Sequence, residues 1–266
     1  MSLNRRFFLS LGLSLPLLPL ATPGRTDAAE DRGLAIATEA SERQSGYQDI
    51  SVSGDMVLRT ASGQEATRRF DASWITTGPG RSRSLLIFRW PGDIRNTALL
   101  THAYRGESDD QWLFLPAMER VRRISGSGRS GSFVGSEFAF EDMVDQEVDK
   151  FDHRWIADER LAGAGQCHVI DRIPTTNSGY SRQRIWLDQQ ELRLQQVHYF
   201  DRRGAHLKTL AISGYRRYAG RFWRASRMEM TNHLTGASTL LNWGDYQFNQ
   251  GLRENAFTVN ALRRIN

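Results

Sequence analysis

Residues 205–248 read AHLKTLAISGYRRYAGRFWRASRMEMTNHLTGASTLLNWGDYQF, and this stretch decides the fold class. It holds three segments rich in β-branched and aromatic residues: 205–217, 221–233 and 237–248. Gly220 and Gly236 mark the turns between them. Segments of this kind, divided by short glycine turns, are typical of consecutive antiparallel strands. The sequence therefore predicts an antiparallel meander in this part of the chain.

The same pattern continues upstream over most of the chain. No helical spacer separates the candidate strands, so the parallel βαβ winding of an α/β protein is excluded. One short helix is predicted over 31–45, with Asp31 as its cap and Gly46 at its end. The further candidate strands are 48–60, 64–76, 83–90, 97–105, 110–116, 118–125, 153–160, 166–173, 180–188 and 191–201.

Both faces of the predicted sheet carry apolar side chains. In the segment 205–217, Leu210 and Ile212 point to one face, whereas Leu207 and Ala211 point to the other. A sheet that is apolar on both faces needs a cover on each face, unless one face lines an apolar cavity. We therefore expect either two covering layers or a cavity on one side.

Residues 141–155 interrupt the meander. Val144, Val148, Phe151 and Trp155 follow one another at helical spacing within an acidic sequence. The pattern predicts a helix over this segment. The helix either packs on the sheet with its acidic side in solvent or acts as a movable lid over a cavity.

The composition fits a folded chain with a substantial core. The 266 residues are 39% hydrophobic and 24% charged, which excludes disorder and allows one large or two small domains. The formal net charge is +5, but the arginines are scattered and only Lys150 and Lys208 are lysines. Because no dense basic block occurs, a nucleic-acid partner is not expected.

Residues 1–29 have the layout of a cleaved export signal. Arg5 and Arg6 precede the apolar run 7–20, which is too short to span a bilayer, and small and polar residues follow it. The mature chain, residues 30–266, is expected to form a single domain in a bacterial periplasm, reached by the twin-arginine or the general export route. No cysteine lies near the cleavage region, so a lipid anchor is not expected.

The sequence offers little support for catalysis or for a bound cofactor. Residues 126–131 match G-x-G-x-x-G, but no helix is predicted after them, so a dinucleotide site is not expected. A phosphate-binding Gly-Lys-Ser/Thr loop, a G-x-S-x-G nucleophile motif and the usual zinc signatures are missing. The six histidines are spread singly, and a pair such as His198 and His206, which could face each other across a hairpin, lacks a third ligand. Cys167 lies in a predicted strand, where a core position is favoured over a reactive thiol.

Four arginines lie close together in the sequence, beside a Ser/Gly-rich loop. They are Arg120, Arg122, Arg123 and Arg129. Guanidinium groups and the backbone N–H groups of such a loop can bind a phosphate or a carboxylate. The alternative is an exposed strand edge that carries ordinary surface arginines.

Residues 109–142 resemble the central motif of a known family. The stretch reads DDQWLFLPAMERVRRISGSGRSGSFVGSEFAFED. It is similar to the outer-membrane lipoprotein-sorting protein family, the periplasmic relatives of the lipoprotein carrier LolA. A second element of that family, P-x-x-I/V-x-x-T-x-L-L, matches residues 91–100. Two departures are mild, since Asn96 stands where the family often has Gly and Glu137 replaces a common Asp.

The resemblance covers nearly all of the mature chain and implies a mainly β (α+β) fold of the LolA/LolB type. In that fold a large antiparallel sheet forms an open half-barrel, and short helices cover an apolar concave face that holds acyl chains. Several apolar side chains are candidates for lining this cavity, with plain sheet core as the alternative for each. They are Met56, Leu58, Trp74, Phe88, Trp90, Leu99, Trp112, Phe114, Phe133, Phe138 and Phe140.

These features predict a soluble periplasmic carrier that holds a lipid, lipoprotein acyl chains or a similar hydrophobic ligand. The carrier would pass its cargo on in outer-membrane sorting or export without chemistry and without a cofactor. Arg120, Arg122 and Arg123 are candidates for contact with a head group or a partner. The resemblance also implies an inner-membrane RND/MMPL-type exporter as partner and transient contact with a membrane.

Two alternatives stay open at this point. The first is an accessory docking protein of such an exporter, whose core is filled by its own side chains and which carries no ligand. The second is a periplasmic lipid hydrolase, which would need a Ser, a His and an Asp to converge in the cavity.

Overall fold

A single large antiparallel sheet dominates the computed structural model, which describes residues 27–265. The strands are β1 (Asp49–Arg59), β2 (Glu65–Gly78), β3 (Arg81–Trp90), β4 (Ala98–Tyr104), β5 (Asp110–Leu115), β6 (Arg120–Ile124), β7 (Phe151–Leu161), β8 (Gly165–Pro174), β9 (Tyr180–Asp188), β10 (Leu194–Asp201), β11 (His206–Tyr218), β12 (Phe222–Asn232), β13 (Ser238–Trp243) and β14 (Gln247–Phe248).

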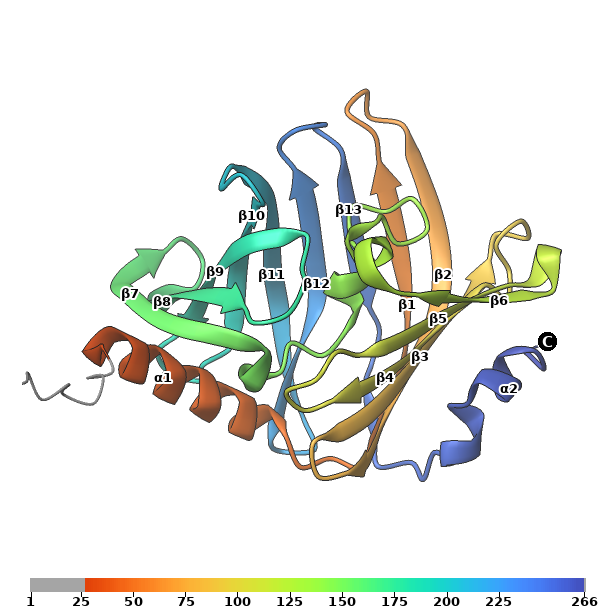
Figure 1. Cartoon of the computed structure of the whole chain (residues 1–266), viewed down its shortest axis with the longest axis horizontal. Coiled ribbons are helices and arrows are strands. Elements are labelled where there is room, and N and C mark those ends of the chain that lie inside the picture. The colour runs from red at the N-terminus through yellow and green to blue at the C-terminus, as the bar shows by residue number, and fades with distance from the viewer. Residues whose placement is uncertain (1–26, 266) are drawn as a thin grey trace, which may run out of the picture.

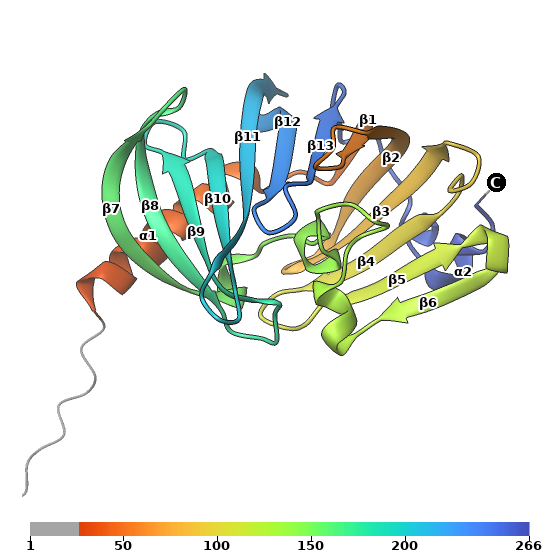
Figure 2. The same ribbon diagram turned by 90° about the horizontal axis from the view of Figure 1, so that it is seen from above.

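The sheet consists of two meanders that meet at one pair of strands. Strands β1 to β6 follow one another on one side, strands β7 to β13 follow one another on the other, and β1 pairs with β13 in the middle. Strands β6 and β7 form the two ends, so the sheet is not closed (Figures 1 and 2). The predicted open antiparallel sheet is therefore confirmed.

The last candidate strand, 237–248, is divided in the structure. β13 ends at Trp243, where the backbone N–H of Gly244 donates to the carbonyl of Ser53 at 2.9 Å. The short strand β14 then pairs with β1 on its own, beyond the end of β13. The chain thus bends where its hydrogen-bond partner changes, a non-local feature that the alternation of residues does not record.

The helix predicted over 141–155 is wrong. The segment contains only two 3-10 turns, η3 (Phe140–Met143) and η4 (Val148–Lys150), and β7 begins at Phe151. Its acidic side chains bind other elements instead of facing solvent along a helix. The Asp145 carboxylate accepts from the Ser82 hydroxyl at 2.9 Å, and short polar side chains that find such partners compete with helix formation.

The N-terminal helix α1 (Ala28–Gln44) is longer than predicted. Its cap is Asp27, whose side chain accepts from the backbone N–H of Ala29, and not Asp31. Gly46 follows the helix with a positive φ of 92°, as glycine after a helix commonly does. The export segment predicted over 1–29 lies outside the described residues, except for this cap and the first two helical residues.

The helix α1 lies along β7 (Figure 1). Gly33 is buried there, and a Cβ atom at this position would lie 2.6 Å from the backbone nitrogen of Trp155. Only glycine permits so close an approach of helix and strand. Arg32 adds an ion pair to Asp158 at 2.8 Å and places its guanidinium 3.8 Å from the centre of the Trp155 ring.

The plug segment, which we define as residues 125–150 between β6 and β7, lies on the concave side of the sheet (Figure 2). Its aromatic side chains Phe133, Phe138 and Phe140 are buried against the sheet. The rings of Phe133 and Phe88 stack with their centres 5.8 Å apart. The plug segment therefore covers part of the concave face with side chains of the chain itself.

A second core lies on the convex side. The C-terminal segment, with η5 (Glu254–Ala256) and α2 (Val259–Leu262), places Phe257 and Leu262 against Leu100 and Phe114. Both faces are thus covered over one half of the sheet, as the apolar residues on both faces suggested. In the part of the chain that the structure describes, no helix is long and apolar enough to cross a membrane.

Candidate ligand-binding site

A cavity of about 880 Å³ lies between α1 and the concave face of the sheet. Small residues of α1, including Ala37, Ala40 and Ser41, form one wall. The loop 145–149 of the plug segment forms another side. The volume lies in the range of about 300–1,000 Å³ that is typical of small-molecule sites.

The wall formed by the sheet is apolar. Ile185, Ile212, Met228, Trp243 and Trp74 lie on five different strands, β9, β11, β12, β13 and β2. The register pairs Ile212 with Met228 across β11 and β12, so these side chains share one face of the sheet. This arrangement can remove a hydrocarbon chain from water.

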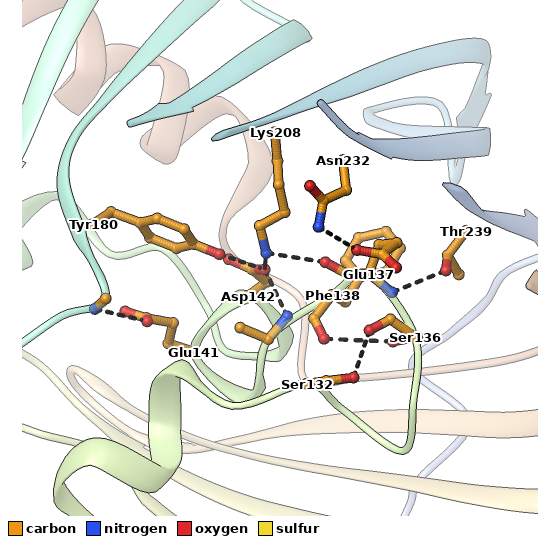
Figure 3. Close-up of polar contacts among 12 residues, drawn as sticks. Ser132, Ser136, Glu137, Phe138, Glu141, Asp142, Tyr180, Lys208, Asn232 and Thr239 are labelled. Carbon is orange, nitrogen blue, oxygen red and sulfur yellow. Dashed lines mark hydrogen bonds and ion pairs between the residues drawn. The ribbon is translucent and has the colours of Figure 1, made fainter. Parts of the chain in front are cut away.

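Buried polar contacts hold the plug segment on the sheet. Lys208 on β11 donates to the Glu137 carbonyl at 2.9 Å and forms an ion pair with Asp142 at 3.3 Å. The Tyr180 hydroxyl donates to the same Asp142 carboxylate at 2.9 Å (Figure 3). Burial, together with the neighbouring Asp142, raises the pKa of Tyr180 well above its usual value.

Further contacts fix both ends of this motif. The Asn232 side-chain amide donates to Glu137 Oε2 at 2.7 Å, and the Glu137 backbone N–H donates to Thr239 Oγ1 at 2.9 Å (Figure 3). The Glu141 carboxylate accepts from the backbone N–H of Gly179 at 2.9 Å. The plug segment is therefore held over one part of the concave face and leaves another part to the cavity.

Charged groups also line the cavity. The Asp145 carboxylate binds the Ser82 hydroxyl, and burial raises the pKa of Asp145. The Arg224 guanidinium donates to Gln44 Oε1 at 2.7 Å and so joins β12 to the end of α1. Arg172 on β8 is only 6% exposed and donates to Gln183 Oε1 at 2.7 Å. The cavity thus combines a hydrocarbon wall with buried hydrogen-bond donors.

The structure distributes the predicted lining residues over several places. Of the eleven candidates, Trp74 lies in the wall of the large cavity, and Leu58 lines a smaller pocket of about 310 Å³ near Glu137. A third group belongs to the core that the sheet forms with the plug segment: Met56, Phe88, Leu99, Phe133, Phe138 and Phe140.

The remaining three candidates lie away from the cavity. Trp112 and Phe114 pack on the convex side with Phe257 of the C-terminal segment. Trp90 is 47% exposed at the end of β3, where the Arg69 guanidinium lies 5.6 Å from its ring centre.

The arginine cluster lies on the end strand β6. Arg120, Arg122 and Arg123 are exposed there, and Arg123 forms an ion pair with Asp110 on β5. Arg129 lies in η2 (Gly126–Ser130), 3.8 Å from Asp109. The G-x-G-x-x-G match forms this 3-10 turn, so no dinucleotide-binding strand–helix unit is present at 126–131.

The predicted meeting of two histidines is found, and a third joins them. The rings of His198 and His206 stack with their centres 4.3 Å apart, and His233 lies 4.4 Å from His206. Within the described residues no group of three or more His, Cys, Asp or Glu side chains is arranged to hold a metal ion. Cys167 is fully buried in β8, as predicted.

Sequence reasoning missed most of the cavity wall. The alternation within 205–217 puts Ile212 on the opposite face from Ala211, so the sequence does indicate which residues share a face with Ile212. It does not say which face is concave, nor which half the plug segment leaves open. Ile185, Met228 and Trp243 come together with Ile212 only through the pairing of five strands, β9 to β13.

Comparisons with solved structures identify the fold. A LolA superfamily protein from Nitrosomonas europaea is similar to this chain with a TM-score of 0.69 and 19% identity, over 86% of this chain and 98% of that one. A DUF1329 family protein from Desulfovibrio piger is similar with a TM-score of 0.84 and 28% identity, over 88% of this chain and 99% of that one. The open sheet thus shares its fold with a LolA superfamily protein.

A further comparison shows the family. An outer membrane lipoprotein-sorting protein domain from Vibrio parahaemolyticus is 41% identical to this chain, with a TM-score of 0.85, over 88% of this chain and all of that one. A family model described only as an uncharacterized protein matches residues 80–264. A search of curated proteins found no match. The chain belongs to the outer-membrane lipoprotein-sorting protein family, as its central motif suggested.

Proposed function

We propose that the protein is a periplasmic carrier that holds a lipid, or the acyl chains of a lipoprotein, in the cavity under α1 and hands this cargo on without chemistry. The cavity of about 880 Å³ with its apolar sheet wall is the observation that carries the proposal. Burial of acyl chains stabilises a complex by about 0.8 kcal/mol per methylene, so retention needs no covalent bond.

The family relationship supports a role in sorting. The 41% identical relative is described as a lipoprotein-sorting domain, and the layout of residues 1–29 predicts export to the compartment where sorting takes place. An RND/MMPL-type exporter as partner, and contact through Arg120, Arg122 and Arg123, stay predictions.

The two alternatives have less support. A docking protein whose concave face is filled by its own side chains does not need an open cavity beside α1. For a hydrolase, a serine in the cavity would have to bind a histidine. Instead the Ser82 hydroxyl donates to Asp145, and His153 Nε2 lies 3.0 Å from the Val148 carbonyl.

The first test is mass spectrometry of the protein purified from periplasm without detergent. Lipid extraction would identify the ligand, and native mass spectrometry would count bound molecules. We expect a stoichiometric lipid or acylated peptide. A ligand-free mass that persists after incubation with native membranes would contradict the carrier function.

A charged substitution in the apolar wall should remove the ligand. Met228→Asp places a carboxylate beside the acyl chains, and its partly buried site in β12 leaves room for hydration, so folding should be kept. The measurement is lipid content per protein, with circular dichroism as the folding check. Leu240→Asp is the matched control, because Leu240 on the adjacent β13 pairs with Glu229 and points to the opposite face from Met228.

We expect the Met228→Asp protein to lose most of its lipid and the Leu240→Asp protein to keep it. Equal lipid content in both variants would exclude this cavity as the binding site.

A further inference from the structure

The guanidinium of Arg172 is buried in the cavity wall without a carboxylate partner. Its Nε donates to Gln183 Oε1 at 2.7 Å, and one terminal nitrogen donates to Gln146 Oε1 at 3.4 Å. Its charged plane lies 4.7 Å from the centre of the Phe151 ring. Among residues 27–265 no carboxylate forms an ion pair with Arg172, so its hydrogen bonds go to neutral amide oxygens, and the Asp142 carboxylate acts on the charge only from beyond ion-pair distance.

The Arg172 guanidinium stays protonated despite its burial. Burial lowers the pKa of Arg172 to about 10, which still leaves the side chain cationic at neutral pH. A buried charge without an ion-pair partner is costly to the free protein. An anionic ligand that forms a charge-assisted pair with the guanidinium would offset this cost.

Other groups around the cavity also favour an anionic ligand. Within residues 27–265 the Arg224 guanidinium donates to Gln44 Oε1 and to the carbonyl of Trp223, both neutral acceptors. Burial raises the pKa of two of the four acidic side chains in the lining, Asp145 and Glu147. The lining holds five arginines against these four acidic side chains, so its formal charge is positive.

Two indole groups add further donors. Trp223 and Trp243 both line the cavity, and within the described part of the chain their buried Nε1–H groups have no acceptor. Trp243 also belongs to the apolar wall, so hydrocarbon and hydrogen-bond donors stand side by side. A ligand made only of hydrocarbon would leave these donors unsatisfied, whereas oxygen atoms on its polar end would satisfy them.

We propose that the cavity takes an amphiphile with an anionic oxygen group, a carboxylate or a phosphate, which pairs with Arg172 while the acyl chain lies on the apolar wall. This inference rests on the proposed carrier function and narrows its cargo. It distinguishes the site from one that selects acyl chains by hydrophobicity alone.

The test compares ligands that differ in charge. The exported protein, after removal of co-purified lipid, is titrated with palmitate, with palmitic acid methyl ester and with phosphatidylglycerol, followed by tryptophan fluorescence. We expect palmitate or phosphatidylglycerol to bind about tenfold or more tightly than the uncharged ester. If the affinity for palmitate depends more strongly on Arg172, the site recognises a carboxylate. If the affinity for phosphatidylglycerol does, the site recognises a phosphate.

The matched variants are Arg172→Gln and Arg184→Gln. Arg184 on β9 lies on the opposite face of the sheet, where it pairs with Asp171 at 2.7 Å. Arg172→Gln should weaken binding of the anionic ligand about tenfold or more and leave the ester within about twofold, whereas Arg184→Gln should change neither. Because Arg172→Gln removes a buried charge that has no ion-pair partner, the melting temperature of this variant without ligand should equal or exceed that of the wild type.

The outcomes separate this inference from the carrier function. Equal affinity of the wild type for palmitate, phosphatidylglycerol and the ester would overturn the anionic-ligand proposal and leave the carrier standing. Failure of all three to bind would overturn both. If the Arg172→Gln protein does not fold, the ratio of acid to ester affinity in the wild type decides.

Discussion

Lys208 is the residue that ties the plug segment to the sheet. Its ammonium group lies 3.3 Å from the Asp142 carboxylate, whose side chain is 2% exposed, and 5.1 Å from the centre of the Tyr180 ring. A buried ion pair adds little net stability over an apolar pair, but removal of one partner leaves the other charge unpaired. The role of this pair is therefore to fix one position of the plug segment.

Lys208→Met should destabilise the protein strongly. The unpaired Asp142 carboxylate would cost about 3 kcal/mol or more in the free energy of unfolding, measured by urea denaturation. The double variant Lys208→Met, Asp142→Asn removes both charges and should recover a large part of that loss. A single variant that loses less than about 1 kcal/mol would show that the pair does not hold the segment.

His198 should make the stability depend on pH. Burial, and the neighbouring rings of His206 and His233, lower the pKa of His198 to about 4, below the usual 6.5. Between these two pH values the unfolded chain binds a proton that the folded chain does not, so stability falls as the pH drops from about 6.5 to about 4.

The size of the effect is about 1 kcal/mol, because the ring is partly open to solvent. His198→Gln should flatten this part of the curve of unfolding free energy against pH. Parallel curves for wild type and variant between pH 7 and pH 4 would contradict the assignment.

Asn96 shows how a single departure from the family pattern can be understood. Its φ is 65°, in the left-handed region where glycine is favoured and asparagine is tolerated better than most other residues. The replacement of glycine by asparagine keeps the turn between β3 and β4.

At the level of elements, α1 forms a wall of the cavity only because Gly33 lets it approach β7. On a free helix, Gly33→Ala would add about 1 kcal/mol of stability through helix propensity. Here the new methyl group would meet the backbone of Arg154 and Trp155, so we expect a loss of about 1–3 kcal/mol and lower lipid retention as α1 moves outward.

The measurements are thermal unfolding and lipid content of the Gly33→Ala protein. A loss of stability indicates that α1 packs on β7, whereas a gain is expected for a free helix. The control Ala35→Gly, at an exposed position of α1, should cost about 1 kcal/mol and leave lipid retention unchanged. A stabilising Gly33→Ala would show that α1 does not pack on β7 in solution.

The elements differ in how well the sequence predicts them. Strands such as β9 and β11 were predicted closely, because alternation and turn residues act within a few positions. The segment 141–155 was not, because its apolar spacing is local whereas the bonds of Asp142 and Asp145 go to Lys208 and Ser82, distant in sequence. The spacing of apolar residues within a segment does not record contacts with residues that are distant in sequence, so it predicted a helix here.

For the whole molecule, the open sheet followed from the sequence but the site followed only in part. The resemblance at 109–142 implied a covered concave face, and the structure shows that the second half of this stretch, within the plug segment, forms part of the cover. The cavity wall lies beside it, on strands whose apolar residues face both ways. Strand pairing and the curvature of the sheet decide which of those residues meet the ligand.

The two free ends of the sheet have a consequence for how this family can diversify. A sheet closed on itself has a diameter fixed by the number and stagger of its strands, so a wider interior requires every strand to be realigned. Here β6 and β7 are the two ends of the sheet, and the plug segment connects them in the chain. Longer segments between these strands, or smaller side chains on α1, can therefore change the volume of the cavity in relatives without any change in the strand pairing.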